Sequence, residues 1–240
     1  MTEIIQSAMA LVDGARTQGL NMRLLGGIAV AIHCPESNNT GRSYRDIDAY
    51  IPAKSQTAIS KYLVQAGYVA DKEFNLLNGD TRLLFHDQAY QRQLDIFVGE
   101  FSMCHRIPLS LNAHPYTVAL AELLLTKLQI IKLNPKDAHD GCALLRSLQL
   151  GTSPAQASTR QRLAQLCGND WGLWRTLTLN LERCVQYTTT HCPEYTTDVS
   201  REATALLSML DAAPKSLAYK MRATLGDKVK WYEEPEEVDR

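Results

Sequence analysis

The segment "GRSYRDIDAYIP", residues 41–52, places Asp46 and Asp48 one residue apart inside an otherwise apolar run. The apolar run closed by Pro52 predicts a β-strand, in which side chains at i and i+2 point to the same face. The two carboxylates then lie side by side and repel each other unless a positive charge lies between them. A solvated edge strand tolerates such a pair, whereas a buried strand needs a cation there. The fold must therefore give this strand either water or a counter-charge.

Composition sets broad limits on the rest of the chain. It has 240 residues, of which 45% are hydrophobic and 21% are charged, which is typical of a globular protein with one large or two small domains. The formal net charge of -1 gives no general attraction to nucleic acid, although it leaves room for a local basic patch.

The cysteine pattern and the apolar runs bear on the compartment. Six cysteines are scattered without a CxxC pair or the spacing of zinc ligands, which predicts reduced, mostly buried thiols: Cys34, Cys104, Cys142, Cys167, Cys184 and Cys192. The chain opens without a charged-then-apolar leader, and its apolar runs stay below the ~18 residues of a membrane span. We therefore expect a cytoplasmic protein with no membrane partner.

Hydrophobic periodicity predicts strands only in the first part of the chain. The patterns there are a helix ending near Gly14 or Gly19, a strand–glycine turn–helix unit over 22–34, the strand closed by Pro52, a helix over 54–68, a hairpin over 73–87 turning at Asn78-Gly79-Asp80, a strand over 92–99, and helices over 117–133 and 136–150. These patterns predict a first domain, residues 1–150, built on a small mixed β-sheet flanked by helices.

The second part of the chain shows only helical patterns. The small, polar segment "GTSPAQAS", residues 151–158, is typical of a linker. Helical patterns follow at about 160–167, 170–187, 198–211 and 214–224. Strands and helices that are segregated in this way indicate the α+β class, with a helical C-terminal domain at 151–240.

Three features of the first part combine into a candidate site. Gly26-Gly27 follows a strand, Asp46 and Asp48 lie on the next one, and Asp95 in "QLDIFVG" lies between apolar neighbours on a later strand. Each feature taken singly has an ordinary structural explanation, such as a tight turn or a solvated edge. Together they suit divalent metal and phosphate, because Mg²⁺ prefers carboxylate oxygens, and because a glycine turn before a helix N-terminus admits a phosphate group.

At "LLGG", "DIDAY" and "QLDIF" the sequence resembles the nucleotidyltransferase superfamily, which has the polymerase-β-like fold and an hG[GS]…Dh[DE]h signature with a third, distant acid. The resemblance implies that Asp46, Asp48 and Asp95 are catalytic and hold Mg²⁺ or Mn²⁺. It also implies that Gly26 and Gly27 admit the β- and γ-phosphates of a nucleoside triphosphate. Asp95 would additionally help to deprotonate the acceptor hydroxyl.

The segment "LAELLLTKLQIIKLNPKDAHD" extends the likeness. It resembles a motif of AbiEii-type nucleotidyltransferases of bacterial toxin–antitoxin and abortive-infection systems, in which a lysine-bearing helix precedes a Lys/Arg-Asp-x-x-Asp segment. Lys127 would then contact nucleotide phosphates; the alternatives are a solvated lysine, and Asp137 and Asp140 as helix caps. Arg42 would reach a phosphate or pair with a site acid, while Tyr44 stands where that branch has threonine. The resemblance covers roughly residues 20–150.

These expectations define a magnesium-dependent transfer of NMP from an NTP to an acceptor, with release of pyrophosphate. The acceptor would be an RNA such as tRNA or a protein, with an antitoxin as partner. The alternatives are a small-molecule nucleotidyltransferase of the antibiotic-modifying type and a non-catalytic nucleotide-binding module.

An RNA cleft would be rimmed by basic side chains, for which the helical part offers Arg160, Arg162, Arg175, Arg183 and Arg201 beside an acidic tail. The sequence leaves this choice, the base preference and the oligomeric state open. Trp171 and Trp174, three residues apart, favour helix packing over base stacking.

Overall fold

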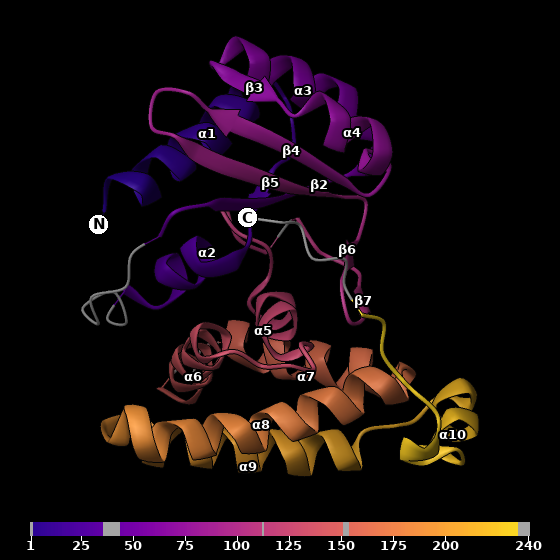
Figure 1. Ribbon diagram of the computed structural model, residues 1–240. Helices are drawn as coiled ribbons and strands as arrows, with labels where there is room; N and C mark the ends of the chain where they lie inside the picture. The colour runs from indigo at the N-terminus through magenta and orange to yellow at the C-terminus, as the bar shows by residue number, and fades with distance from the viewer. Residues whose placement is uncertain (1, 36–43, 112, 151–153, 235–240) are drawn as a thin grey trace. The chain divides into compact units, whose positions relative to one another are not determined.

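Strands β2 and β5 run parallel at the centre of a five-stranded sheet in the computed structural model, which describes residues 2–35, 44–111, 113–150 and 154–234 (Figure 1). The order β1-β2-β5-β4-β3 has antiparallel pairs everywhere else, so the sheet is mixed, as the sequence predicts. The strands are β1 (Arg23–Leu24), β2 (Ile47–Ile51), β3 (Tyr68–Ala70), β4 (Arg82–Asp87) and β5 (Arg92–Val98).

Register divides the central strands into an apolar and a polar face. Asp48 is the register partner of Asp95, which in turn is paired with Leu84. Alternate residues point to opposite faces, so Asp48 and Asp95 share one face. The other face is buried and apolar along most of its length, among its residues Ile47, Ala49, Leu83, Leu94 and Ile96, and becomes polar only at Asp87 and Arg92, where β4 meets β5 in the hairpin. The pleat thus places Asp48 and Asp95 on one face and a mainly apolar surface on the other.

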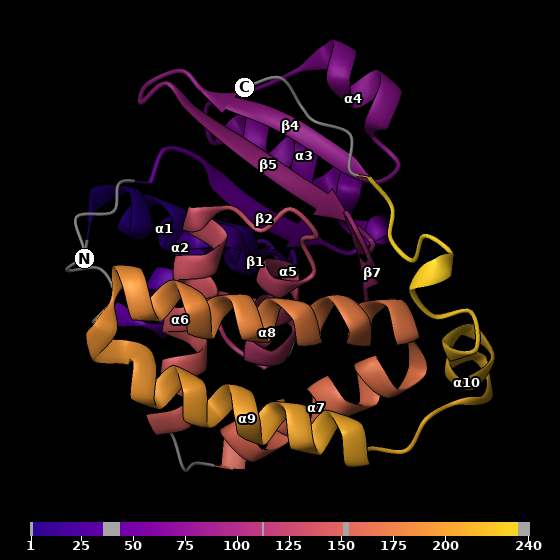
Figure 2. The same ribbon diagram turned by 60° about the horizontal axis from the view of Figure 1, so that its bottom comes forward.

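The helices of this sheet unit are α1 (Glu3–Thr17), α2 (Gly26–His33), α3 (Gln56–Gln65) and α4 (Lys72–Asn78), with a 3-10 turn, η2 (Ala53–Ser55). Figure 2 shows α3 lying across one face of the sheet. Its Tyr62 hydroxyl donates to the carbonyl of Leu11 in α1 at 2.8 Å. A Cβ at Gly14 would lie 2.3 Å from that hydroxyl oxygen, so a glycine lets the two helices approach.

The predicted hairpin over 73–87 is wrong. Residues Lys72–Asn78 form α4, because the Asp71 side chain accepts a hydrogen bond from the Phe74 amide at 3.0 Å and so caps a helix there. The Asn-Gly-Asp signal therefore marks the end of a helix. The true hairpin joins β4 to β5, and its turn contains Gln91 with a φ of 53°. Strand β3 lies where the sequence predicts only the end of a helix.

The chain divides into two compact units, one comprising residues up to Ser102 together with Ile107–Ala119, and the other comprising Met103–Arg106 with Leu120–Arg240. Short strands β6 (Phe101–Ser102) and β7 (Arg106–Ile107) pair where the chain first passes between the units. The division falls between Ala119 and Leu120 rather than after residue 150. In addition, residues 154–158 of the expected linker belong to helix α7.

The second unit is helical, which agrees with the predicted class. Its helices are α5 (Leu120–Leu128), α6 (Pro135–Leu150), α7 (Pro154–Asn169), α8 (Trp171–His191), α9 (Thr196–Ala212) and α10 (Leu217–Ala223), with 3-10 turns η3 (Pro193–Tyr195) and η4 (Gly226–Lys228). Helix α5 is buried on nearly all sides, and Asn180 of α8 donates to the carbonyls of Leu128 and Ile130 at 2.7 and 2.8 Å. Helix α5 therefore forms part of this bundle, which explains why the division precedes it.

Three further expectations can be compared with the structure. Trp171 and Trp174 pack within the second unit, with ring centroids 6.0 Å from Trp231 and 5.9 Å from Tyr219 respectively. All six cysteines are free and buried, as predicted. Within the described ranges, no helix is both long enough and apolar enough to cross a bilayer.

The end of α2 generates a prediction about pH. His33 lies 2.7 Å from the Thr117 hydroxyl and 4.8 Å, between ring centroids, from His114, whose carbonyl accepts a hydrogen bond from Arg23. Burial, followed by the charge of His114, lowers the pKa of His33 to about 4. The unfolded chain, with a histidine pKa of about 6.5, therefore binds more protons between these values. Stability should fall as the pH drops from about 6.5 to about 4, by roughly 2 kcal/mol for this partly buried ring.

Amide exchange of the α2 segment at pH 7 and pH 4.5 measures this effect. His33→Gln should reduce the loss of protection at pH 4.5, whereas His191→Gln, on an exposed ring in the other unit, should leave it unchanged. Equal pH dependence in the wild type and in His33→Gln would show that the buried imidazole is not the source.

Candidate functional site

The glycine turn contacts the strand that carries the acidic pair. The Leu25 amide donates to the Asp48 carbonyl at 2.8 Å, which fixes the turn against β2. Gly26 has a φ of +60°, and a Cβ placed on it would lie 1.9 Å from Asp48 Oδ2. Position 26 thus requires glycine for two reasons: its left-handed backbone conformation and the close approach of the Asp48 carboxylate. The structure therefore brings Gly26 and Asp48 into direct contact.

Helix α2 begins at this turn and presents its N-terminus beside Asp48. Leu25 precedes the helix and provides no side-chain cap, and the first turn, which includes Gly27, contains no acidic residue. The first amides of a helix have no intrahelical acceptor, and the helix dipole makes this end positive. A helix N-terminus that begins after an apolar residue and has glycines in its first turn is suited to bind an anion such as a phosphate.

Asp95 forms an ion pair that the sequence does not predict. Its side chain is 3% exposed, and Arg82 of β4 donates Nε to Oδ1 at 2.8 Å and Nη2 to Oδ2. Burial would lower the pKa of Arg82, but the hydrogen bonds and charge of Asp95, together with the charge of Asp48, raise it above its ordinary value. The guanidinium carbon lies 5.1 Å from the centroid of the Phe97 ring. Arg82 thus holds both carboxylate oxygens of Asp95.

The other residues predicted near the acidic pair do not complete a metal centre. Asp46 precedes β2 and is half-buried, and Arg42 lies outside the described residues. Within the described part of the chain, no group of three or more His, Cys, Asp or Glu side chains is placed to hold a metal ion. The donor chemistry suits Mg²⁺, but the arrangement does not, because both oxygens of Asp95 bind Arg82.

Lys127 belongs to a charged cluster of the second unit. Its Nζ lies 2.9 Å from Asp137 Oδ1 and 3.1 Å from Asp140 Oδ2. The side chains of Lys127 and Asp140 are only 12% and 1% exposed, so the alternative of a solvated lysine is wrong. Asn134 accepts from the Asp137 amide at 2.9 Å and begins α6. The lysine and the two acids of the Lys…Asp-x-x-Asp motif are therefore brought together as an ion-pair cluster, and the structure gives no contact of this cluster with a nucleotide.

The arginines considered for an RNA-binding rim are largely engaged inside the second unit. Arg160 pairs with Glu202 at 2.8 Å, Arg162 with Glu122 at 3.3 Å, and both carboxylates are 1% exposed. Arg183 donates to the carbonyl of Ile131 at 2.8 Å. Sequence inspection counts such arginines as surface charge, whereas these stabilise contacts between helices.

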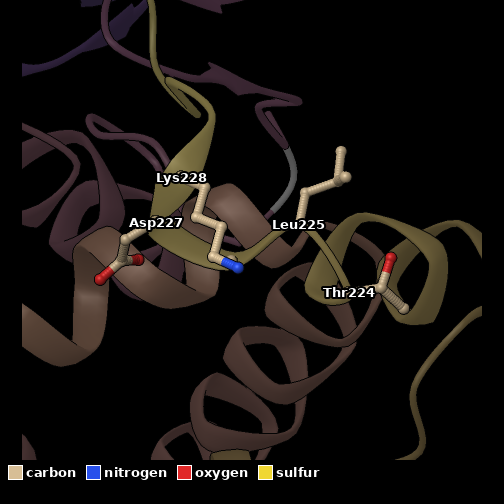
Figure 3. Close-up of a pocket in the computed structure, with 5 residues that line it drawn as sticks. Thr224, Leu225, Asp227 and Lys228 are labelled. Carbon is tan, nitrogen blue, oxygen red and sulfur yellow. The ribbon is translucent and has the colours of Figure 1, made fainter.

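A surface hollow of about 610 Å³ lies at the C-terminal side of the second unit (Figure 3). It is lined by Thr224, Leu225, Gly226, Asp227 and Lys228. The Asp227 carboxylate pairs with Arg175 at 2.7 Å. The hollow contains none of the residues predicted for the site, so it offers no support for a nucleotide pocket.

Comparison with known proteins leaves the family unassigned. No protein-family model matches this sequence, and no curated protein matches it. Among solved structures, a "tRNA-processing enzyme (apo form I)" is similar over 93% of this chain with 16% identity and a TM-score of 0.33. The aligned region spans 63% of that structure's length. A superposition this loose defines neither a shared fold nor a shared activity.

The contact of Gly26 with Asp48 predicts a large effect of a single methyl group. Gly26→Ala introduces a left-handed alanine, which costs about 1–2 kcal/mol, and also displaces the Asp48 carboxylate. Gly19→Ala is the matched control, because Gly19 has a φ of +72° but no atom within 4 Å of the added Cβ. Urea unfolding should show a clearly greater loss of stability for Gly26→Ala. Equal losses would contradict the close approach.

The Lys127 cluster predicts a structural cost of removing the lysine. Lys127→Met leaves Asp140 buried without this cation and should destabilise the protein by about 3 kcal/mol. Lys136→Met, at an exposed lysine in the first turn of α6, should have little effect. The double variant Lys127→Met/Asp140→Asn should recover part of the loss. Thermal unfolding measures all three variants, and an unchanged Lys127→Met would leave substrate contact as the better explanation for this lysine.

Proposed function

We propose that this chain is a nucleotidyltransferase that moves NMP from a nucleoside triphosphate to an acceptor nucleophile and releases pyrophosphate. The observation that carries the proposal is the packing of Gly26 against Asp48, whose register partner on the adjacent parallel strand is Asp95. A helix N-terminus suited to phosphate and two carboxylates are thereby combined within one sheet unit. In metal-dependent nucleotidyl transfer the first element can bind phosphate oxygens and the second can hold the metal ion.

The residues would act by positioning and by charge. The turn at Gly26 and Gly27, with the first amides of α2, would bind phosphate oxygens where a larger side chain would exclude them. Asp46, Asp48 and Asp95 would supply the oxygen donors that orient the reacting groups. Mg²⁺ or Mn²⁺ is the cofactor this function requires. Asp95 would have to leave Arg82 before it could bind such an ion or accept a proton.

The acceptor belongs to the same proposal. The resemblance to AbiEii-type enzymes favours an RNA such as tRNA, or a protein, as the acceptor, an antitoxin as partner and a cytoplasmic location. Lys127 and Arg42 would contribute to the nucleotide site in that family. A small-molecule acceptor is the alternative within the same chemistry.

A second candidate function is a nucleotide-binding regulatory module without catalysis. The ion pair of Arg82 with Asp95 is the specific observation in its favour, because it withdraws one carboxylate from metal binding. Such a module would bind a nucleoside triphosphate at the α2 turn and leave it intact.

A labelling experiment tests the function and separates these outcomes. The protein is incubated with each α-labelled NTP and Mg²⁺ or Mn²⁺, in turn with total RNA, total protein and a small-molecule pool. We expect label on one acceptor class, loss of transfer in Asp48→Asn, and normal transfer in Asp80→Asn, an exposed acid of the same unit.

NTP-dependent stabilisation provides the second measurement. A ligand at 100 times its Kd should add about 2.7 kcal/mol of apparent stability. Stabilisation without transfer would favour the regulatory module. The absence of both stabilisation and label transfer with all four nucleotides would overturn the proposed nucleotide site.

A further inference from the structure

The ion pair between Arg82 and Asp95 lies where a metal ligand is expected. From its position on β4, Arg82 donates a hydrogen bond to each carboxylate oxygen of Asp95 on the neighbouring strand β5. Divalent cations bind to the same oxygens. A guanidinium that holds both oxygens takes two of the roughly four lone-pair sites of the carboxylate and repels a divalent ion that approaches the others.

We propose that Arg82 is an internal counter-ion that occupies Asp95 in place of a divalent cation, so that the guanidinium and the cation compete for the same carboxylate. The biological meaning of this competition, control over when the site takes up metal, rests on the proposed nucleotidyltransferase function. The competition itself concerns only residues of the sheet unit.

Several contacts hold Arg82 in this position. The register places Arg82 opposite Phe97, while Asp95 is opposite Leu84, so the arginine reaches diagonally, two pairs along the strand, to bind the acid on the same face. Its guanidinium carbon lies 5.1 Å from the Phe97 ring centroid and 6.0 Å from that of Phe74 in α4. Aromatic faces stabilise a weakly hydrated, planar cation. The site is therefore built for a guanidinium, which suits the carboxylate in a two-pronged geometry.

Charge gives the competition its direction. Arg82 cancels the charge of one of the two register-paired carboxylates, Asp48 and Asp95, and its field reaches both of them. A divalent ion approaching this face meets a positive group that is only 20% exposed and therefore weakly screened by water. Removing the guanidinium should raise affinity for a divalent ion at Asp95, whereas removing a counter-ion that pairs with another acid of the sheet unit should leave that affinity unchanged.

Titration of the nucleotide-free protein with Mn²⁺, followed by the electron paramagnetic resonance of the free ion, tests the proposal. Arg82→Met should bind Mn²⁺ at least about tenfold more tightly than the wild type. Arg82→Met/Asp95→Asn should lose the gain. Arg92→Met is the matched control, because Arg92 of the same sheet also pairs with a carboxylate, that of Glu3, with a closest N–O distance of 2.5 Å. It should bind Mn²⁺ as the wild type does.

Thermal unfolding in Mn²⁺ supplies an independent readout. Arg82→Met leaves the buried Asp95 without its partner and should melt earlier than the wild type. Added Mn²⁺ should reverse much of the decrease in Tm caused by Arg82→Met. It should not raise the Tm of the double variant or of Arg92→Met in this way. If Arg82→Met does not fold, Arg82→Lys takes its place, since lysine keeps the charge but gives up the paired geometry. A smaller gain in affinity, about threefold, is then expected.

Equal Mn²⁺ affinity in the wild type and the folded Arg82 variant, or a gain that survives loss of Asp95, would overturn the proposal. Failure of the nucleotidyltransferase function would be seen differently, as absent NTP stabilisation and absent label transfer in the wild type. The Mn²⁺ comparison involves no nucleotide, so each hypothesis can fail without the other.

Discussion

The parallel pairing of β2 with β5 is the constraint on which the candidate site depends. It aligns Asp48 with Asp95, although these residues lie far apart in the sequence. Parallel neighbours require a crossover, and here the chain between them supplies α3, β3, α4 and β4. Strand β4, the last element of this crossover, pairs antiparallel with β5 and so places Arg82 beside the strand that carries Asp95. The crossover that makes β2 and β5 parallel therefore also positions the counter-ion of Asp95.

The elements that the sequence predicts well are those with strong local signals. The α+β class, the strand–glycine turn–helix unit and the strands of Asp48 and Asp95 follow from periodicity and from the glycine pair. Helix α4 does not, because the Asn-Gly-Asp turn signal competes with the cap at Asp71, and only tertiary context decides between them. Arg82 could not be found either. An arginine at the start of an apolar strand gives no sign of its partner, because that partner depends on register.

The second unit shows why charge counted along the sequence misleads. Glu122, Glu202 and Asp140 are almost wholly buried, and each pairs with a basic side chain. A buried carboxylate is costly without a partner, so each of these acids commits an arginine or lysine to an ion pair within the unit. The sequence shows only that both signs are present. Helix packing decides which arginines remain available to contact an acceptor. Packing also places α5 and α6 in this unit rather than in the sheet unit.

Stability does not explain why a charged pair occupies the polar face of the sheet at Asp95. Replacing a buried ion pair with apolar side chains of similar size is often neutral or stabilising, so such a pair is weak evidence for a structural purpose. On the opposite face the positions level with Asp48 and Asp95 are buried and apolar, which shows that this fold readily fills such positions with Ile, Leu and Ala. Retaining an acid here, beside Asp48 and the Gly26 turn, makes sense if its carboxylate has a second use. While no metal ion is bound, Arg82 pairs with Asp95 and so keeps the sheet folded. Because this ion pair can be exchanged for a metal ion, the packing of β4 is linked to the chemistry of the site.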